Sequence, residues 1–130
     1  RFMRIGVTIE AITDVDIMKM NSVLLDGECA AIGISVSGRT EAVIHSLQSA
    51  KKCGAAVILM TSHIEKKFQN FCDEIMLFAV KANLEKGKAI SPQFPILVMV
   101  DIIYSRMLRM DDFRRETLHE YTLEVLERDS

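Results

Sequence analysis

Two short and almost wholly apolar runs constrain the fold of this chain most strongly. They cover residues 29–34 and 55–60, and neither alternates polar with apolar side chains. Such runs are typical of β-strands that are covered on both faces, as in a parallel sheet between helices. Between them, residues 41–52 carry apolar side chains along one side of a helix. This order of strand, helix and strand predicts a βαβ unit with a right-handed crossover.

The rest of the chain continues the same alternation. Further strands are predicted at 7–11 and 74–78, the second of them toward a sheet edge. Further helices are predicted at 15–25, with Thr13 or Asp14 as the cap, at 64–71, at 96–110, and from 111 or 112 to about 128, with a polar loop over 81–88. The whole pattern predicts an α/β fold, a three-layer doubly wound parallel sheet, in one domain over 1–130.

The composition argues against several classes of protein. The net charge of −2 gives no basic face of the kind that nucleic-acid binders carry. No apolar run reaches the ~20 residues that a membrane span needs, and the first twelve residues do not resemble a signal peptide. The three cysteines are far apart, which is typical of reduced thiols and not of a disulfide frame or zinc site. We therefore expect a cytoplasmic protein without membrane contact, metal or cofactor.

The segment after the first apolar run is rich in hydroxyl groups. Ser35, Ser37 and Thr40 lie with Gly38 at the predicted turn from strand to helix. Backbone N–H groups and the helix dipole favour an anion at such a turn. Each hydroxyl can donate one hydrogen bond to a phosphate oxygen, and the backbone N–H groups of 36–40 can add more. The alternative is that these hydroxyls merely cap the following helix, although a cap needs only one.

Two catalytic patterns come close to this loop without matching it. Residues 33–40 approach the nucleotide-binding loop G-x-x-x-x-G-K-[ST], but Arg39 stands where the pattern requires lysine. In addition, Gly33 is predicted inside the strand. The serine-hydrolase elbow G-x-S-x-G fails because Ser37 occupies the position of its second glycine. A cradle for a single phosphate that needs no metal is therefore the favoured interpretation.

The same residues resemble a known family. A strand followed by S-x-S-G-x-T, then a helix ending near 50–55, then V-I-L-M-T-S, is similar to the sugar isomerase (SIS) domain. The resemblance is strongest to the C-terminal effector domain of RpiR-type transcriptional regulators. It implies a flavodoxin-like, five-stranded parallel sheet that binds phosphosugars. It also implies that the family's first strand, its glycine-serine loop and the DNA-binding domain lie outside this chain, and residues 1–6 accordingly read as the end of a helix capped by Gly6.

The resemblance also implies roles for individual residues. Ser35, Ser37 and Thr40 would be the phosphate-binding hydroxyls, Val36 and Gly38 would contribute backbone, and Ser62 would lie near the sugar. The expected function is a phosphosugar-sensing effector domain, acting as a homodimer or higher homo-oligomer that contacts DNA only through the attached domain. The sugar phosphate would shift the population of dimer arrangements and thereby the affinity for DNA.

A stand-alone phosphosugar isomerase is the alternative function. Such an enzyme needs a general base, usually Glu or His, beside the sugar carbons. His63 follows the second apolar strand and is the best-placed candidate, with an ordinary exposed turn histidine as the competing interpretation. His45 and His119 are predicted on polar helix faces, and nothing singles out Glu10. Because no Glu and His pair is evident, we expect no catalytic residues and favour the sensor.

Overall fold

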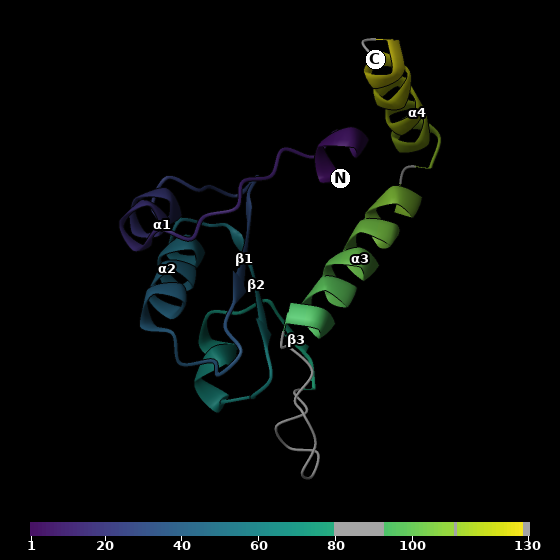
Figure 1. Cartoon of the computed structure of the whole chain (residues 1–130). Coiled ribbons are helices and arrows are strands. Elements are labelled where there is room, and N and C mark those ends of the chain that lie inside the picture. Colours follow the sequence, from purple (N-terminus) through teal and green to yellow (C-terminus); the bar gives the residue numbers. More distant parts are fainter. Residues whose placement is uncertain (80–92, 111, 129–130) are drawn as a thin grey trace. The chain divides into compact units, whose positions relative to one another are not determined.

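Three strands form a parallel sheet in the order β1-β2-β3 (Figure 1). Their bounds are Ala30–Ile34 for β1, Ala56–Thr61 for β2 and Glu74–Leu77 for β3. In this computed structural model, which describes residues 1–79, 93–110 and 112–128, Ile34 pairs with Met60 and Thr61 pairs with Leu77. The predicted α/β fold with a parallel sheet is therefore confirmed, and the strands end together at one edge of the sheet.

The chain divides into two compact units. One unit comprises Ile12–Ile96 and holds the sheet, and the other comprises Arg1–Ala11 with Leu97–Ser130. The predicted polar loop at 81–88 lies outside the described residues. No helix among the described residues is long and apolar enough to cross a membrane.

The sheet unit buries one face of β1 and β2 under the helix α2 (Glu41–Lys52), and α1 (Val15–Ser22) packs against α2. Gly33 allows this close packing, because a Cβ atom there would lie 2.6 Å from Leu47 Cδ1. The residues that make up the buried core are Val43, Ile44, Leu47, Ala50, Ala55, Val57, Leu59, Phe68 and Phe71. They come from α2, from residues 55–59 at the start of β2, and from the segment 68–71, so the core packs α2 against β2 and that segment.

Asp73, the residue before β3, is hydrogen-bonded to the start of β2. Its Oδ2 accepts a hydrogen bond from the Val57 N–H at 2.7 Å, and its own N–H donates to Val57 O at 2.8 Å. Its Oδ1 accepts from Lys51 Nζ at 2.5 Å, which adds an ion pair with the end of α2. The Lys51 hydrogen bond and the Val57 N–H hold the pKa of Asp73 below its usual 3.8.

This network predicts an acid-dependent loss of stability. Because the pKa of Asp73 is lowered by folding, its ionised form stabilises the native state above pH 3.8, and that contribution is lost as the pH falls further. We expect Asp73→Asn to lower the melting temperature at neutral pH and the difference from wild type to shrink below pH 4. Thermal melts across pH test this, with Glu28→Gln, an exposed carboxyl, as control. A difference that stays constant with pH would contradict the assignment.

The other unit joins the N-terminal segment to the helix α4 (Asp112–Arg128) and to the part of α3 (Gln93–Met110) from Leu97 onward. The 3-10 helix η1 (Phe2–Ile5) ends at Gly6, whose φ of 75° is the left-handed conformation of a helix cap. Phe2 packs edge-to-face on Tyr104 at 5.5 Å, and Arg115 Nη1 donates to Ile5 O at 3.0 Å. The predicted glycine cap is therefore confirmed.

Several helices and strands differ in their bounds from those predicted. The helix at 41–52 is confirmed at both ends, and Asp14 caps α1 by accepting from the N–H groups two and three residues later. The predicted strand at 7–11 is wrong: these residues belong to no strand of the sheet, and the Val7 N–H donates instead to Phe2 O at 3.2 Å. Residues 64–71 form only the 3-10 helix η2 (Lys66–Asn70), and α1 ends at Ser22 instead of residue 25.

Candidate functional site

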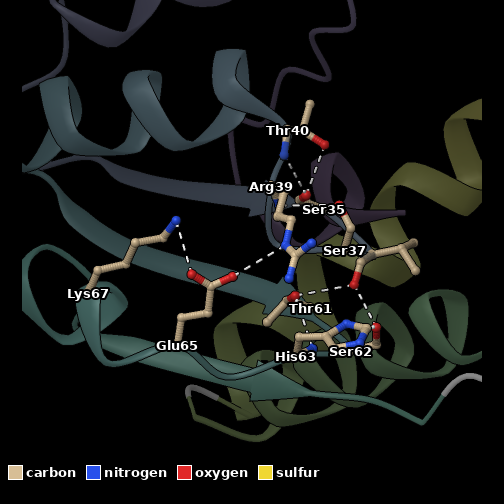
Figure 2. A network of polar contacts seen from close by, with 10 residues as sticks. Ser35, Ser37, Arg39, Thr40, Thr61, Ser62, His63, Glu65 and Lys67 are labelled. Carbon is tan, nitrogen blue, oxygen red and sulfur yellow. Dashed lines mark hydrogen bonds and ion pairs between the residues drawn. The ribbon is translucent and has the colours of Figure 1, made fainter.

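The hydroxyl-rich loop 35–40 lies at the carboxyl end of β1, beside the segment that follows β2 (Figure 2). Two backbone hydrogen bonds join the segments: Ser35 N–H donates to Met60 O, and Ser62 N–H donates to Val36 O, both at 3.0 Å. Within the loop, Gly38 N–H donates to Ser35 O at 3.0 Å and closes a turn. The two predicted hydroxyl segments therefore meet at one edge of the sheet, where ligands of open α/β sheets bind.

Ser35 and Thr40 are hydrogen-bonded to each other across the loop. Their hydroxyl oxygens lie 2.9 Å apart, and Ser35 Oγ also accepts from the Thr40 N–H at 3.4 Å. Ser35 is buried, whereas Thr40 is exposed. One hydroxyl proton is used in the mutual bond, so the pair keeps a single proton to donate to a ligand. The two hydroxyls together can therefore donate one hydrogen bond to a ligand, instead of the one from each that the sequence predicts.

This arrangement leaves the N-terminus of α2 without a side-chain cap. Thr40 occupies the N-cap position with extended backbone, but its hydroxyl makes no capping hydrogen bond. The first N–H groups of a helix have no partner within the helix, and a capping side chain normally accepts from one of them. The alternative that these hydroxyls merely cap the helix is therefore wrong. The dipole and the N–H groups of a 12-residue helix remain directed at the loop.

Ser37 is the exposed hydroxyl of the loop. Its Oγ accepts from the Arg39 N–H at 3.2 Å, so its own proton remains available to a ligand. In the part of the chain that the structure describes, the N–H groups of Val36 and Ser37 have no hydrogen-bond acceptor. The loop thus presents two backbone donors and one hydroxyl donor beside the helix N-terminus, a set suited to a tetrahedral anion.

Gly38 is required by both its backbone and its neighbours. Its φ is 69°, a left-handed conformation that side chains with a Cβ atom rarely adopt. A Cβ atom there would also lie 2.8 Å from Phe68 Cζ and 3.1 Å from Thr61 Oγ1. The chain can therefore reverse between Ser37 and Arg39 only at a glycine that packs directly on η2.

Ser62 supports the loop from the second strand. Its Oγ donates to Val36 O at 2.6 Å and lies 2.8 Å from His63 Nδ1. With its proton on Val36 O, Ser62 accepts from Nδ1–H of His63, which leaves the His63 Nε2 as a hydrogen-bond acceptor. Thr61 Oγ1 adds a third contact to Val36 O at 3.3 Å. His63 is exposed, and its ring is linked to the loop through one hydroxyl.

The remaining candidates make none of the contacts described for this site. His45 is exposed on α2, whereas Glu10 and His119 belong to the other unit. Burial, with a smaller effect from Asp73, raises the pKa of Cys72 to about 11, so its thiol stays protonated at neutral pH. Among the described residues, no three or more His, Cys, Asp or Glu side chains are grouped to hold a metal ion.

A charged network beside the loop was not anticipated from the sequence. Glu65 Oε1 lies 3.6 Å from Arg39 Nε, and its Oε2 lies 3.0 Å from Lys67 Nζ (Figure 2). The hydrogen bond from Lys67, with smaller effects from its charge and from Arg39, holds the pKa of Glu65 below its usual value against the opposing effect of burial. In sequence, Arg39 and Glu65 are 26 positions apart, so only the fold brings them together.

Comparison with known proteins identifies the family. A family model described as the SIS domain matches residues 1–100. An uncharacterised HTH-type transcriptional regulator of Haemophilus influenzae is 25% identical over 126 residues, 97% of this chain and 44% of the relative. The HTH-type transcriptional regulator RpiR of Escherichia coli K12 is 27% identical over 111 residues, 85% of this chain and 38% of the relative.

The fold also matches a solved structure. The Vibrio vulnificus NanR protein complexed with ManNAc-6P superposes with a TM-score of 0.82 at 21% identity, over 99% of this chain and 48% of NanR. This similarity shows a shared fold. The chain spans less than half the length of each of these proteins.

Proposed function

The chain belongs to the SIS domain family, and we propose on that premise that it is the phosphosugar-sensing effector domain of an RpiR-type transcriptional regulator. The observation that carries the proposal is the uncapped N-terminus of α2 behind a loop of hydroxyl and N–H donors. Because the Thr40 side chain does not cap α2, an anion is a suitable hydrogen-bond acceptor for the N–H groups in the first turn of this helix.

In this proposal the loop binds the phosphate group of the ligand. The N–H groups of Val36 and Ser37, the hydroxyl of Ser37 and the remaining proton of the Ser35–Thr40 pair donate to its oxygens. Gly38 gives the loop its left-handed turn, Ser62 holds Val36 in place, and we propose that the sugar ring lies near Ser62. Hydrogen bonds to a charged acceptor of this kind are the strong ones in proteins.

The relatives support the regulatory part of the proposal. Both curated relatives described above are HTH-type regulators, and the NanR structure is a complex with the sugar phosphate ManNAc-6P. We propose that a sugar phosphate favours one arrangement of a homodimer and thereby changes the DNA affinity of an attached domain. A ligand can shift such an equilibrium only by its difference in affinity for the two states.

An isomerase is the second candidate, favoured by one observation. The ring of His63 is hydrogen-bonded to Ser62 at the edge of the loop, and its Nε2 can accept a proton. A base in that position could act on a sugar carbon beside the phosphate site. The sensor remains the preferred function because the relatives are regulators and no second acid-base group lies in the described contacts of His63.

A ligand screen on the full-length protein tests the proposal. We expect hexose and amino-sugar 6-phosphates, with ManNAc-6P among them, to include a compound that raises the melting temperature and alters DNA binding. The matching unphosphorylated sugars are the controls and should produce no shift. Binding of no sugar phosphate would contradict the proposal, and turnover of the bound sugar phosphate would replace the sensor with the isomerase.

A further inference from the structure

We propose that Arg39 is an additional phosphate-binding residue, and that Glu65 acts as a positioning residue that holds its guanidinium beside the loop. This inference rests on the proposed function, since it concerns the same phosphate site. The donors described above are all uncharged groups, apart from the partial charge of the helix dipole. A sugar phosphate carries up to two negative charges at neutral pH, so a nearby cation would strengthen its binding.

The backbone of Arg39 is fixed inside the loop. Its N–H donates to Ser37 Oγ at 3.2 Å, directly after the left-handed turn at Gly38. Figure 2 shows its side chain extending from the loop toward Glu65, with the guanidinium between the two. The backbone of Arg39 therefore belongs to the loop that we assign to the phosphate, and its guanidinium lies beside the same loop.

The contact between Arg39 and Glu65 is loose enough to yield to a ligand. Nε lies 3.6 Å from the carboxylate oxygen, longer than the 2.7–2.9 Å of a strong charged hydrogen bond. The Arg39 side chain is 79% exposed. An exposed pair of this kind contributes little stability, whereas a guanidinium binds a phosphate with two parallel hydrogen bonds.

Glu65 is held in place by the element that follows it. It is the N-cap residue of η2, where Phe68 is fully buried and packs on Gly38. Its other oxygen bonds Lys67 Nζ at 3.0 Å. Two cations then share one carboxylate, which leaves a net positive charge beside the loop. The packing of Phe68 on Gly38 thus fixes the position of Glu65 relative to the loop, and Glu65 in turn holds the exposed guanidinium of Arg39 nearby.

Lys67 provides a matched control for a simple effect of charge. It binds the same carboxylate as Arg39, and its ammonium lies 5.7 Å from the centre of the Phe68 ring. In Figure 2 it lies on the opposite side of Glu65 from the loop. Removing either cation changes the net charge equally, but only Arg39 is placed to touch a phosphate in the loop.

Phosphate titrations of the full-length protein test this inference. With inorganic phosphate as the probe, followed by phosphorus NMR at several KCl concentrations, we expect Arg39→Gln to weaken binding about 10-fold. The salt dependence of binding should also become flatter. Arg39→Lys should recover part of the affinity because it keeps the charge, and Lys67→Gln should stay within about threefold of wild type, as expected for an exposed charge.

The outcomes separate this inference from the proposed function. If Arg39→Gln binds phosphate as wild type does, or if Lys67→Gln weakens binding as much as Arg39→Gln, the assignment of Arg39 is overturned while the loop can still bind phosphate. Wild-type protein that binds neither inorganic phosphate nor a sugar phosphate overturns both.

Discussion

Alanine at both Ser37 and Thr40 is expected to abolish sugar-phosphate binding, with a loss of about 100-fold or more in affinity. Each hydroxyl that donates to a charged acceptor contributes about 1.5–3 kcal/mol, and losing two therefore costs at least two orders of magnitude. Ser37 carries one exposed hydroxyl of the loop, and Thr40 is the exposed member of the Ser35–Thr40 pair, so its hydroxyl is the one that we expect to donate the pair's remaining proton to the ligand. Isothermal titration calorimetry with the compound selected by the ligand screen measures the effect.

Two further variants make this test specific. Thr40→Ser keeps a hydroxyl at the N-cap position and should retain affinity within a few-fold of wild type. Ser49→Ala removes a hydroxyl from the far end of the same helix and should have no effect on binding. If the double alanine variant binds the ligand with unchanged affinity while remaining folded, the loop is not the phosphate site.

Phe68→Ala is expected to lower the free energy of unfolding by about 3–5 kcal/mol, the usual cost of removing a buried aromatic ring. Phe68 is fully buried, packs edge-to-face on Phe71 at 6.2 Å, and supports Gly38 from below the loop. A loss of this size is a large part of the 5–15 kcal/mol that stabilises a typical domain. Urea unfolding followed by circular dichroism measures it.

Ile64→Ala is the control for this prediction. Ile64 comes from the same segment but is 60% exposed, so its loss should change the stability by no more than about 0.5 kcal/mol. The folded fraction of Phe68→Ala should also bind phosphate more weakly, because both the loop and Glu65 lose their support. Equal stabilities of Phe68→Ala and wild type would show that η2 does not hold the loop.

The parts of the fold that could be predicted from sequence are those fixed by local patterns. The bounds of α2 follow from a 3.6-residue apolar period and a glycine soon after its end, and β1 and β2 from short apolar runs. The cap of α1, predicted at Thr13 or Asp14 and found at Asp14, and the left-handed Gly6 also depend on neighbouring residues alone. The strand predicted at 7–11 failed because a strand needs a partner, and β-branched composition says nothing about whether one is present.

The candidate site likewise has features that the local sequence predicts and contacts that only the fold brings about. The sequence by itself determined the hydroxyl loop between strand and helix, whose S-x-S-G-x-T pattern resembles the SIS family to which the chain belongs, because such a pattern is contained in a few consecutive residues. Only the tertiary structure decided that Thr40 bonds Ser35 instead of capping α2, and that Ser62 holds Val36. It also brought Glu65 to Arg39. These contacts join residues from different segments. Which partner a hydroxyl or a charged group bonds depends on the distances between side chains in the folded chain, and those distances are set by the tertiary structure.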